Sequence, residues 1–181
     1  MMQYRLIRSR RKTIAIEITP RGEILVRAPA RMANRDIQRF LESRQDWIAA
    51  QLAKLPAVPP LTETQHRALI QSAKNRLSEK AAFFAPLLGV TFGRVTIRSQ
   101  RTRWGSCSGS GNLRFNCLLM LAPEAVQDYV VVHELCHRKQ MNHSAAFWAE
   151  VEALLPDYRL SRQWLKENGA SLLARLPDPQ K

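Results

Sequence analysis

The feature that most constrains the fold is the sequence His-Glu-Leu-Cys-His at residues 133–137, which follows the apolar run 129–132. Side chains four residues apart stack on one face of a helix, so the imidazoles of His133 and His137 can converge on one ion. Glu134 is displaced from that pair by one position, so its carboxylate can reach a water beside the ion instead of the ion. The pattern predicts a largely apolar helix that carries a metal site.

A third histidine lies close to this pair. A catalytic zinc site has three protein ligands and leaves one position for water. His143 follows the pair by six residues, and we expect it to be the third ligand if the chain turns soon after Gln140. A zinc ion lowers the pKa of its water toward ~7, and Glu134 would take the proton during attack on a carbonyl or phosphoryl centre. The predicted chemistry is hydrolysis, with Glu134 as general base and zinc, or another divalent metal, as cofactor.

Length and composition limit the class of protein. A chain of 181 residues forms one domain, or one domain with an N-terminal extension. It contains no apolar stretch near the ~20 residues that span a bilayer, and its basic N-terminus lacks the apolar core of a secretory signal. The three cysteines, Cys107, Cys117 and Cys136, show no pattern of a disulfide framework. We therefore expect a cytoplasmic protein without membrane contact; the oligomeric state is not indicated.

The net charge of +13 is unevenly distributed. Residues 1–60 hold 12 basic and 5 acidic side chains, residues 61–120 hold 9 and 2, and residues 121–181 hold 7 and 8. Such an excess favours anionic partners, although a basic surface also simply keeps a protein soluble. A second hypothesis is therefore a nucleic-acid or acidic-partner binding module with a structural metal. That metal site would be closed by a fourth protein ligand, Cys107 or Glu150.

Hydrophobic periodicity predicts an α+β fold with an N-terminal lobe. Alternating apolar residues predict three short strands, at 4–8, 13–18 and 23–28, that form a β-meander. One amphipathic helix should follow, from a cap at Asn34 to residue 55. A proline-rich connector comes next, so the predicted domains are residues 1–56, the β-meander and helix lobe, and residues 61–176, the metal-binding catalytic domain.

The second domain should hold both helices and strands. The predicted elements are a helix at 63–88, strands at 91–99 and 112–118, the motif helix from Pro123 to about Gln140, and helices at 144–155 and 158–168. Asn142 is expected to end the motif helix in the left-handed conformation, and Ser144 to cap the next helix. That kink would bring His143 back toward the histidine pair. Gly169 is expected just past the end of the last helix.

Several segments resemble the YgjP-like metal-dependent hydrolases, which are relatives of the SprT and WLM zinc peptidases. The resemblance covers most of the chain and is specific from about residue 101 to 156. It implies a zincin-like α+β catalytic domain with His133, His137 and His143 as metal ligands and Glu134 as general base. The family is usually described as metallopeptidases, and some members are attributed a nucleoside-triphosphate pyrophosphatase activity. The segments are Arg103-Trp104-Gly105-Ser106-Cys107, residues 116–121, Pro123, residues 129–137, Asn142-His143-Ser144 and Phe147-Trp148.

Two comparisons narrow the ligand set. The histidine spacing agrees with that of the metzincins, H-E-x-x-H-x-x-G-x-x-H, but Gln140 stands at the glycine position, so metzincin membership is not expected. A glutamate ligand from a later helix, as in other zincins, would have to be Glu150 or Glu152. We expect His143 in preference to either, because both glutamates can face solvent.

Arg101 and Arg103 are the candidate substrate-binding residues. They precede a glycine turn and could place guanidinium groups near the cleft, where they would bind phosphate or stabilise an oxyanion. An equally good interpretation is a basic edge held by the packing of Trp104. The near-neutral C-terminal third fits a peptide or protein substrate, whereas these arginines with Arg98 and Arg114 fit a nucleotide triphosphate. We favour a metallopeptidase, with phosphoanhydride hydrolysis at the same site as the alternative.

Overall fold

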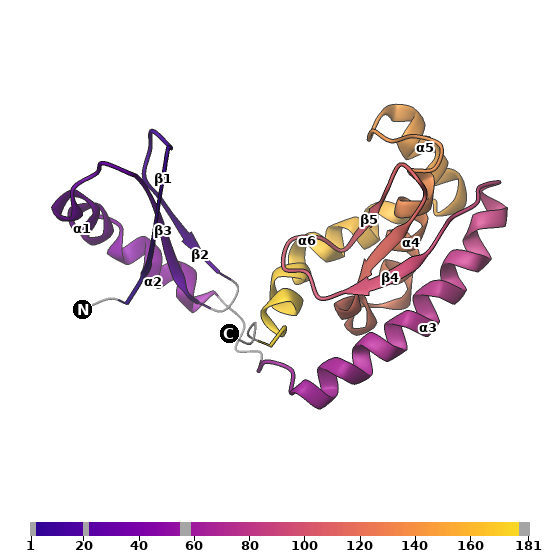
Figure 1. Ribbon diagram of the computed structural model, residues 1–181, viewed down its shortest axis with the longest axis horizontal. Helices are drawn as coiled ribbons and strands as arrows, with labels where there is room; N and C mark the ends of the chain where they lie inside the picture. Colours follow the sequence, from indigo (N-terminus) through magenta and orange to yellow (C-terminus); the bar gives the residue numbers. More distant parts are fainter. Residues whose placement is uncertain (1–2, 20–21, 55–58, 178–181) are drawn as a thin grey trace. The chain divides into compact units, whose positions relative to one another are not determined.

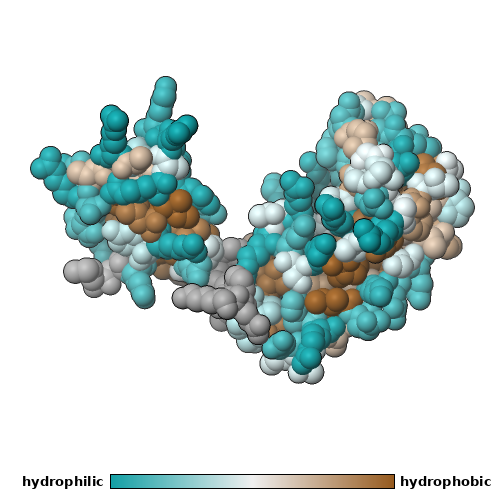
Figure 2. All heavy atoms as spheres, in the orientation of Figure 1, coloured by the Kyte–Doolittle hydropathy of each residue, from teal (hydrophilic) through white to brown (hydrophobic). Residues whose placement is uncertain are grey.

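A computed structural model describes residues 3–19, 22–54 and 59–177 of the chain. The chain divides into two compact units, residues 1–58 and 59–181, each of which is described here by itself (Figure 1). The described residues form six α-helices and two three-stranded sheets, so the predicted α+β class is confirmed. None of these helices combines the length and the apolar sequence that crossing a bilayer requires. In both units, hydrophilic side chains cover much of the face seen in Figure 2.

The sheet of the N-terminal unit has the strand order β1-β3-β2. Strand β3 pairs in parallel with β1 and antiparallel with β2. A meander requires each strand to pair antiparallel with the next in sequence, so the predicted β-meander is wrong for β1. The three strands span Arg5–Ser9 (β1), Ala15–Ile18 (β2) and Ile24–Pro29 (β3).

The burial of β3 gives the physical reason for this order. Its alternate residues Ile24, Val26 and Ala28 are at most 6% exposed, so β3 gains most from a neighbour on each side. The Arg8 guanidinium strengthens the parallel pairing, because it donates hydrogen bonds to the carbonyls of Ala30 and Met32 just beyond β3, at 3.0 and 2.7 Å. Alternation along one strand does not indicate which strand it will pair with.

Two helices, α1 (Asn34–Glu42) and α2 (Gln45–Ala53), cover one face of this sheet. The single predicted helix from 34 to 55 is therefore interrupted, at residues 43 and 44. Ser43 competes with the helix there, since its hydroxyl donates to the carbonyl of Phe40 at 2.8 Å. Asn34 is also not the N-cap; its side-chain oxygen accepts a hydrogen bond from Arg8 at 2.6 Å instead.

The C-terminal unit begins with the long helix α3 (Glu63–Leu87), which runs alongside strand β4 in Figure 1. Thr62 and Gln65 form a capping box at its start, and Gly89, with φ +66°, follows its end. The second sheet has the order β4-β6-β5, in which β6 is parallel to β4 and antiparallel to β5. The remaining elements are β4 (Val95–Arg98), β5 (Gly105–Cys107), β6 (Leu113–Asn116), a 3-10 turn (Cys117–Leu121), α4 (Glu124–Cys136), α5 (Ala145–Leu154) and α6 (Tyr158–Ala174).

Three details of this unit differ from the prediction. Strand β5 was not expected, because Gly105-Ser106-Cys107 has no apolar alternation. Helix α4 ends at Cys136 and not near Gln140. Helix α6 continues through Gly169 to Ala174. Gly169 is needed for packing and not for ending the helix, since a Cβ there would lie 3.2 Å from Cζ2 of Trp104.

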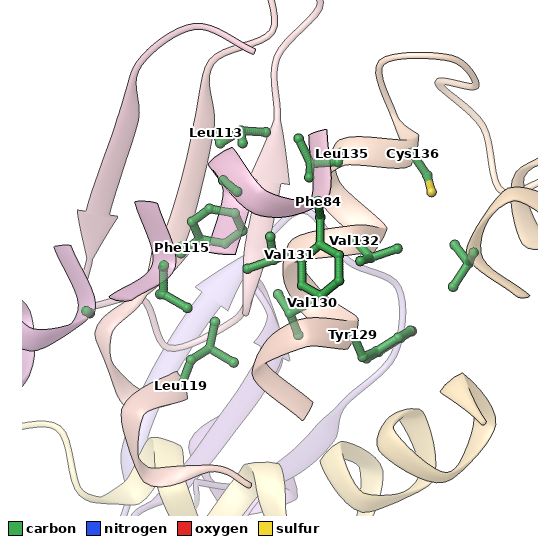
Figure 3. Close-up of a cluster of buried hydrophobic side chains, with 14 of the residues drawn as sticks. Phe84, Leu113, Phe115, Leu119, Tyr129, Val130, Val131, Val132, Leu135 and Cys136 are labelled. Carbon is green, nitrogen blue, oxygen red and sulfur yellow. The ribbon is translucent and has the colours of Figure 1, made fainter. Parts of the chain in front are cut away.

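The core of the C-terminal unit fixes the rotation of α4. Leu113 and Phe115 of β6, Phe84 of α3, and Val131 and Leu135 of α4 meet in one cluster (Figure 3). All five side chains are at most 9% exposed. Val131 and Leu135 lie four residues apart, so one face of α4 packs in this core. The face with His133 and His137 therefore lies toward α5 and α6.

Candidate metal centre

The three histidines come together although they belong to different local structures. His133 lies on α4, His137 is the C-cap residue of that helix, and His143 lies in the loop before α5. One ligand atom from each ring lies within 4.8 Å of the other two, and the Nε2 atoms of His133 and His143 are 3.0 Å apart. Nitrogen ligands at 2.0–2.1 Å from a tetrahedral zinc ion are about 3.4 Å from one another. The ligand nitrogens of the three rings are therefore close enough together to bind one ion.

The turn after α4 positions the second and third histidines. Backbone amides of residues 138–140 bond back to Leu135 and Cys136, which brings the Gln140 carbonyl to 3.0 Å from Nδ1 of His137. With its proton on Nδ1, His137 donates to that carbonyl and keeps Nε2 available as a ligand. Hydrogen bonds of this kind commonly orient metal-binding histidines.

The loop that carries His143 is shaped by side-chain hydrogen bonds. No non-glycine residue of the described ranges has a positive φ, so the predicted left-handed Asn142 is wrong. Its side-chain oxygen instead accepts from the backbone amide of Ser144 at 3.3 Å, and the Ser144 hydroxyl accepts from Phe147 at 3.4 Å to cap α5. This Asx turn followed by an N-cap returns His143 to the helix histidines without a left-handed residue.

Aromatic side chains form the wall of the site. The ring of Phe147 lies 4.7–4.9 Å, centre to centre, from the rings of all three histidines. Trp148 lies 5.8 Å from both His133 and His143. Phe147 is fully buried, so this wall excludes water from one side of the triad and limits the rotation of the rings.

The histidines fit a divalent cation. His133 is mostly buried, and its Nδ1 has no hydrogen-bond partner. Burial, followed by the charges of His137, His143 and Arg162, lowers the pKa of His133 to about 3. Burial and the charges of His137 and Arg162 also lower the pKa of His143. Neutral imidazoles with free lone pairs are the form that metal binding requires, and three nitrogen donors suit zinc.

Glu134 is enclosed on the sheet side of α4 and is 6% exposed. Burial raises its pKa to about 8, while a hydrogen bond from the backbone amide of Cys107 and the charge of Arg103 act in the opposite direction. A carboxylate whose pKa lies near the working pH can both accept and return a proton. Gly105 also lies against the carboxylate, and it has no side chain to displace it.

The two candidate substrate arginines differ in their surroundings. Arg101 donates a hydrogen bond to the carbonyl of Pro177 at 2.9 Å, so it connects the loop before β5 to the segment after α6. Arg103 is exposed, and its charge acts on Glu134. The structure thus brings the charge of Arg103 to the site, whereas Arg101 contacts the segment after α6.

The alternative metal ligands do not join the triad. Glu150 is paired with Lys139 at 2.8 Å, and Glu152 with Arg159 at 2.6 Å. The Cys107 thiol points to the carbonyl of Ser108 at 3.4 Å. Within the described ranges, the clustered ligand atoms belong to the three histidines.

Sequence reasoning missed the functional environment supplied by residues far from the motif. Asn116 is 1% exposed and donates to the carbonyls of Gln100 and Arg103, at 2.6 and 3.0 Å, which holds the loop that leads into β5. Gly105 lies in the segment from Arg103 to Cys107, which is one of those that resemble the family. That resemblance was the signal in the sequence that could have indicated a role for Gly105. No pattern in the sequence indicated Arg162, whose guanidinium carbon lies 4.9 Å from the centre of the Trp148 ring.

The chain is similar to known proteins. The sequence matches the model of a family described as YgjP-like, metallopeptidase domain, over residues 12–66 and 60–168. No curated protein matches the chain. Two of the similar solved structures are metallopeptidase zymogens. The metallopeptidase zymogen abylysin of Pyrococcus abyssi is 22% identical, with 50% of this chain and 93% of that chain covered and a TM-score of 0.46. The metallopeptidase zymogen jannalysin of Methanocaldococcus jannaschii is 18% identical, with 51% and 95% covered and a TM-score of 0.46.

Proposed function

The chain belongs to the YgjP-like metallopeptidase family, and we propose that it is a zinc-dependent peptidase of the zincin type. Membership of this family makes it a hydrolase that uses a divalent metal. In our proposal His133, His137 and His143 hold the metal, and Glu134 is the general base. One observation carries the proposal: three imidazoles converge within 4.8 Å beside a carboxyl group that is buried and has a raised pKa.

When bound, a zinc ion supplies Lewis acidity, which makes water acidic near neutral pH and polarises a carbonyl. Glu134 accepts the proton of the attacking water and returns it to the leaving amine. The Cys107 backbone amide holds the carboxylate of Glu134 in place for both transfers. The Gln140 carbonyl and the ring of Phe147 keep the imidazole of His137 in one orientation. These contacts preorganise the groups before substrate arrives, which lowers the reorganisation needed for reaction.

A peptide is the substrate class that the family supports. Phosphoanhydride hydrolysis would use the same metal and the same base, and it remains the alternative. Of the two arginines predicted to hold a substrate, Arg101 already bonds to the carbonyl of Pro177. The three cysteines are free thiols, which supports a cytoplasmic location as part of the proposal.

Association with nucleic acid is a separate proposal that rests on charge alone. The first 58 residues carry 12 basic and 5 acidic side chains. Counterion release would make such binding steeply dependent on salt. If the protein is a binding module with a structural metal, its affinity for DNA will fall with salt and will not change in Glu134→Gln. Absence of binding at moderate salt argues against the module.

The decisive experiment compares two substrates in parallel. An unfolded protein and a set of nucleoside triphosphates are each incubated with the zinc-loaded and the magnesium-loaded protein, and new amino termini and released phosphate products are quantified. We expect new amino termini with zinc, and their loss in Glu134→Gln while zinc is still bound. Full activity in Glu134→Gln removes the general base from the proposal. If phosphate products are released and no new amino termini form, the protein is a pyrophosphatase and not a peptidase.

A further inference from the structure

A positive charge lies beside the histidine triad and has no role in the mechanism above. Arg162 is on α6, one turn after Tyr158, and its guanidinium carbon lies 4.9 Å from the centre of the Trp148 ring. The same Trp148 ring is 5.8 Å from the rings of His133 and His143. The guanidinium is therefore separated from the candidate ligands by a single side chain.

Aromatic packing holds Arg162 in this position. Tyr158 is 5% exposed and stacks on Trp148 at 5.3 Å, which fixes this face of α6 against α5. A residue four positions later on a helix lies on the same face, so Arg162 is directed to the Trp148 ring as well. The cation–π contact with Trp148 restricts the guanidinium without neutralising its charge.

The charge of Arg162 is not compensated by an ion pair within the described part of the chain. Arg162 is exposed and makes no hydrogen bond or ion pair with any residue that the structure describes, whereas Arg159 on the same helix is paired with Glu152 at 2.6 Å. The charge of Arg162 also reaches the triad, where it adds to the effect of burial in lowering the pKa of His133 and of His143. A cation at this place opposes the binding of a metal ion, so it adds nothing to the metal site itself.

An anion beside the Trp148 ring, within reach of both the metal and Arg162, would be attracted by both. Glu134 is the acidic residue next to His133, and the charge of Arg103 offsets it. With a divalent cation bound, the site is therefore net positive and favours a negatively charged group of the substrate. His143 is exposed like Arg162, so both are open to solvent. A guanidinium binds carboxylates through two parallel hydrogen bonds, which gives direction as well as attraction.

We infer that the Arg162 guanidinium binds a carboxylate of the peptide substrate next to the histidine triad. The inference rests on the proposed peptidase function and specifies its substrate class as peptides with a carboxylate near the cleaved bond. That carboxylate is either the C-terminal one or the side chain of an acidic residue. Arg162 is in this view a substrate-binding residue that selects among peptides, in addition to the residues that carry out the reaction.

The test measures binding, so that it is independent of turnover. Fluorescent peptides of one sequence are prepared with a free or an amidated C-terminus, each with Glu or Gln beside the scissile position. Their dissociation constants are measured by anisotropy with zinc-loaded Glu134→Gln and with Glu134→Gln/Arg162→Gln. We expect roughly 10- to 100-fold weaker binding of one carboxylate peptide, as for loss of a hydrogen bond between charged groups, and unchanged binding of its neutral analogue. The peptide that responds identifies the carboxylate.

Two further variants separate recognition from structure. Arg162→Lys retains the charge and should restore part of the preference for the carboxylate. Arg159→Gln, in the Glu134→Gln background, removes a neighbouring arginine that also lies over a tyrosine, and it should leave the preference unchanged. Because Arg162 is exposed and unpaired, thermal melting should be the same with and without Arg162→Gln.

The inference fails if Arg162→Gln weakens the charged and neutral peptides equally, or weakens neither. Cleavage of the same peptides by the zinc-loaded wild-type protein separates this failure from that of the proposed function. If the wild-type protein cleaves them and Arg162→Gln keeps the carboxylate preference, the proposed peptidase function is supported and the proposed role of Arg162 is rejected. If no peptide is bound or cleaved, both fall together.

Discussion

A Cβ atom on Gly105 would lie 2.6 Å from Oε1 of Glu134 and 2.7 Å from its Cγ. Strand β5 and helix α4 thus meet at a separation that leaves no room for a methyl group. The contact places the Glu134 carboxylate directly against the backbone of the strand, where the amide of Cys107 bonds to it. Gly105 is needed here for this close approach and not for a special backbone conformation.

We expect Gly105→Ala to displace the Glu134 carboxylate and to lower kcat by roughly 10-fold or more, because a misplacement of about 1 Å in a catalytic group has large effects on rate. Zinc content should be unchanged, since the histidines lie on another face of α4. Gly109→Ala is the matched control, because a Cβ there meets no atom within 4 Å. Equal rates for Gly105→Ala and the wild-type protein would contradict the role of this contact.

Zinc should stabilise the folded protein through His143. A ligand at 100 times its dissociation constant adds about 2.7 kcal/mol of stability, so the melting temperature should rise on addition of zinc and fall back on chelation. His143→Ala should lose most of this rise. His66→Ala removes the histidine that lies outside the triad and contacts Ser99 at 2.7 Å, and it should keep the full rise. A zinc-dependent rise that survives His143→Ala would exclude His143 from the ligand set.

The sheet of the C-terminal unit should be sensitive to cavities. Leu113 is fully buried on the central strand β6, so Leu113→Ala should lower the free energy of unfolding by about 2–5 kcal/mol. Leu160 is 71% exposed, and Leu160→Ala should change the free energy of unfolding by less than about 0.5 kcal/mol. Urea-induced unfolding of the metal-free variants measures both values. Similar losses for the two leucines would show that β6 is not at the centre of the core.

Stability should depend on pH through Glu124, at the start of α4. A hydrogen bond and the charge of Lys80, followed by those of Arg76, lower the pKa of the Glu124 carboxyl. The folded state therefore binds this proton less readily than the unfolded chain. The stabilisation is present above the unfolded pKa of about 4.3 and is lost as the pH falls through the lower pKa of the folded protein.

The comparison of wild type and Glu124→Gln between pH 7 and pH 3 checks this dependence. We expect Glu124→Gln to be slightly less stable at pH 7, with the difference becoming smaller toward acid pH as Glu124 takes up its proton in the folded protein. Glu79→Gln, at an exposed acidic position of α3 without an ion pair among the described residues, should show no such trend. A difference between wild type and Glu124→Gln that increases toward acid pH would have the wrong sign.

Local patterns in the sequence predicted most of the helices and strands. The 25-residue helix α3, the hairpin of β2 and β3, and the cap at Ser144 follow from periodicity and from residue types that act within one turn. The wrong predictions concern partners and ends. Strand β1 pairs with β3 because β3, the most buried of the three strands, takes the central place in the sheet, and α6 passes Gly169 because Trp104 lies against it. Neither cause is visible in the segment that it affects.

In the candidate site, too, some features follow from the local sequence and others only from tertiary packing. His133 and His137 are four residues apart, so in a helix they lie on one face independently of the rest of the fold. His143 follows six residues later, so the segment just after the helix was the expected source of the third imidazole. Tertiary packing alone brought Gly105 against Glu134, closed the site with Phe147, and set Arg162 over Trp148. Helical periodicity is a property of the local backbone and can be read along the chain. Contacts between β5, α4, α5 and α6 depend on how whole surfaces fit, and no local stretch of residues encodes that fit.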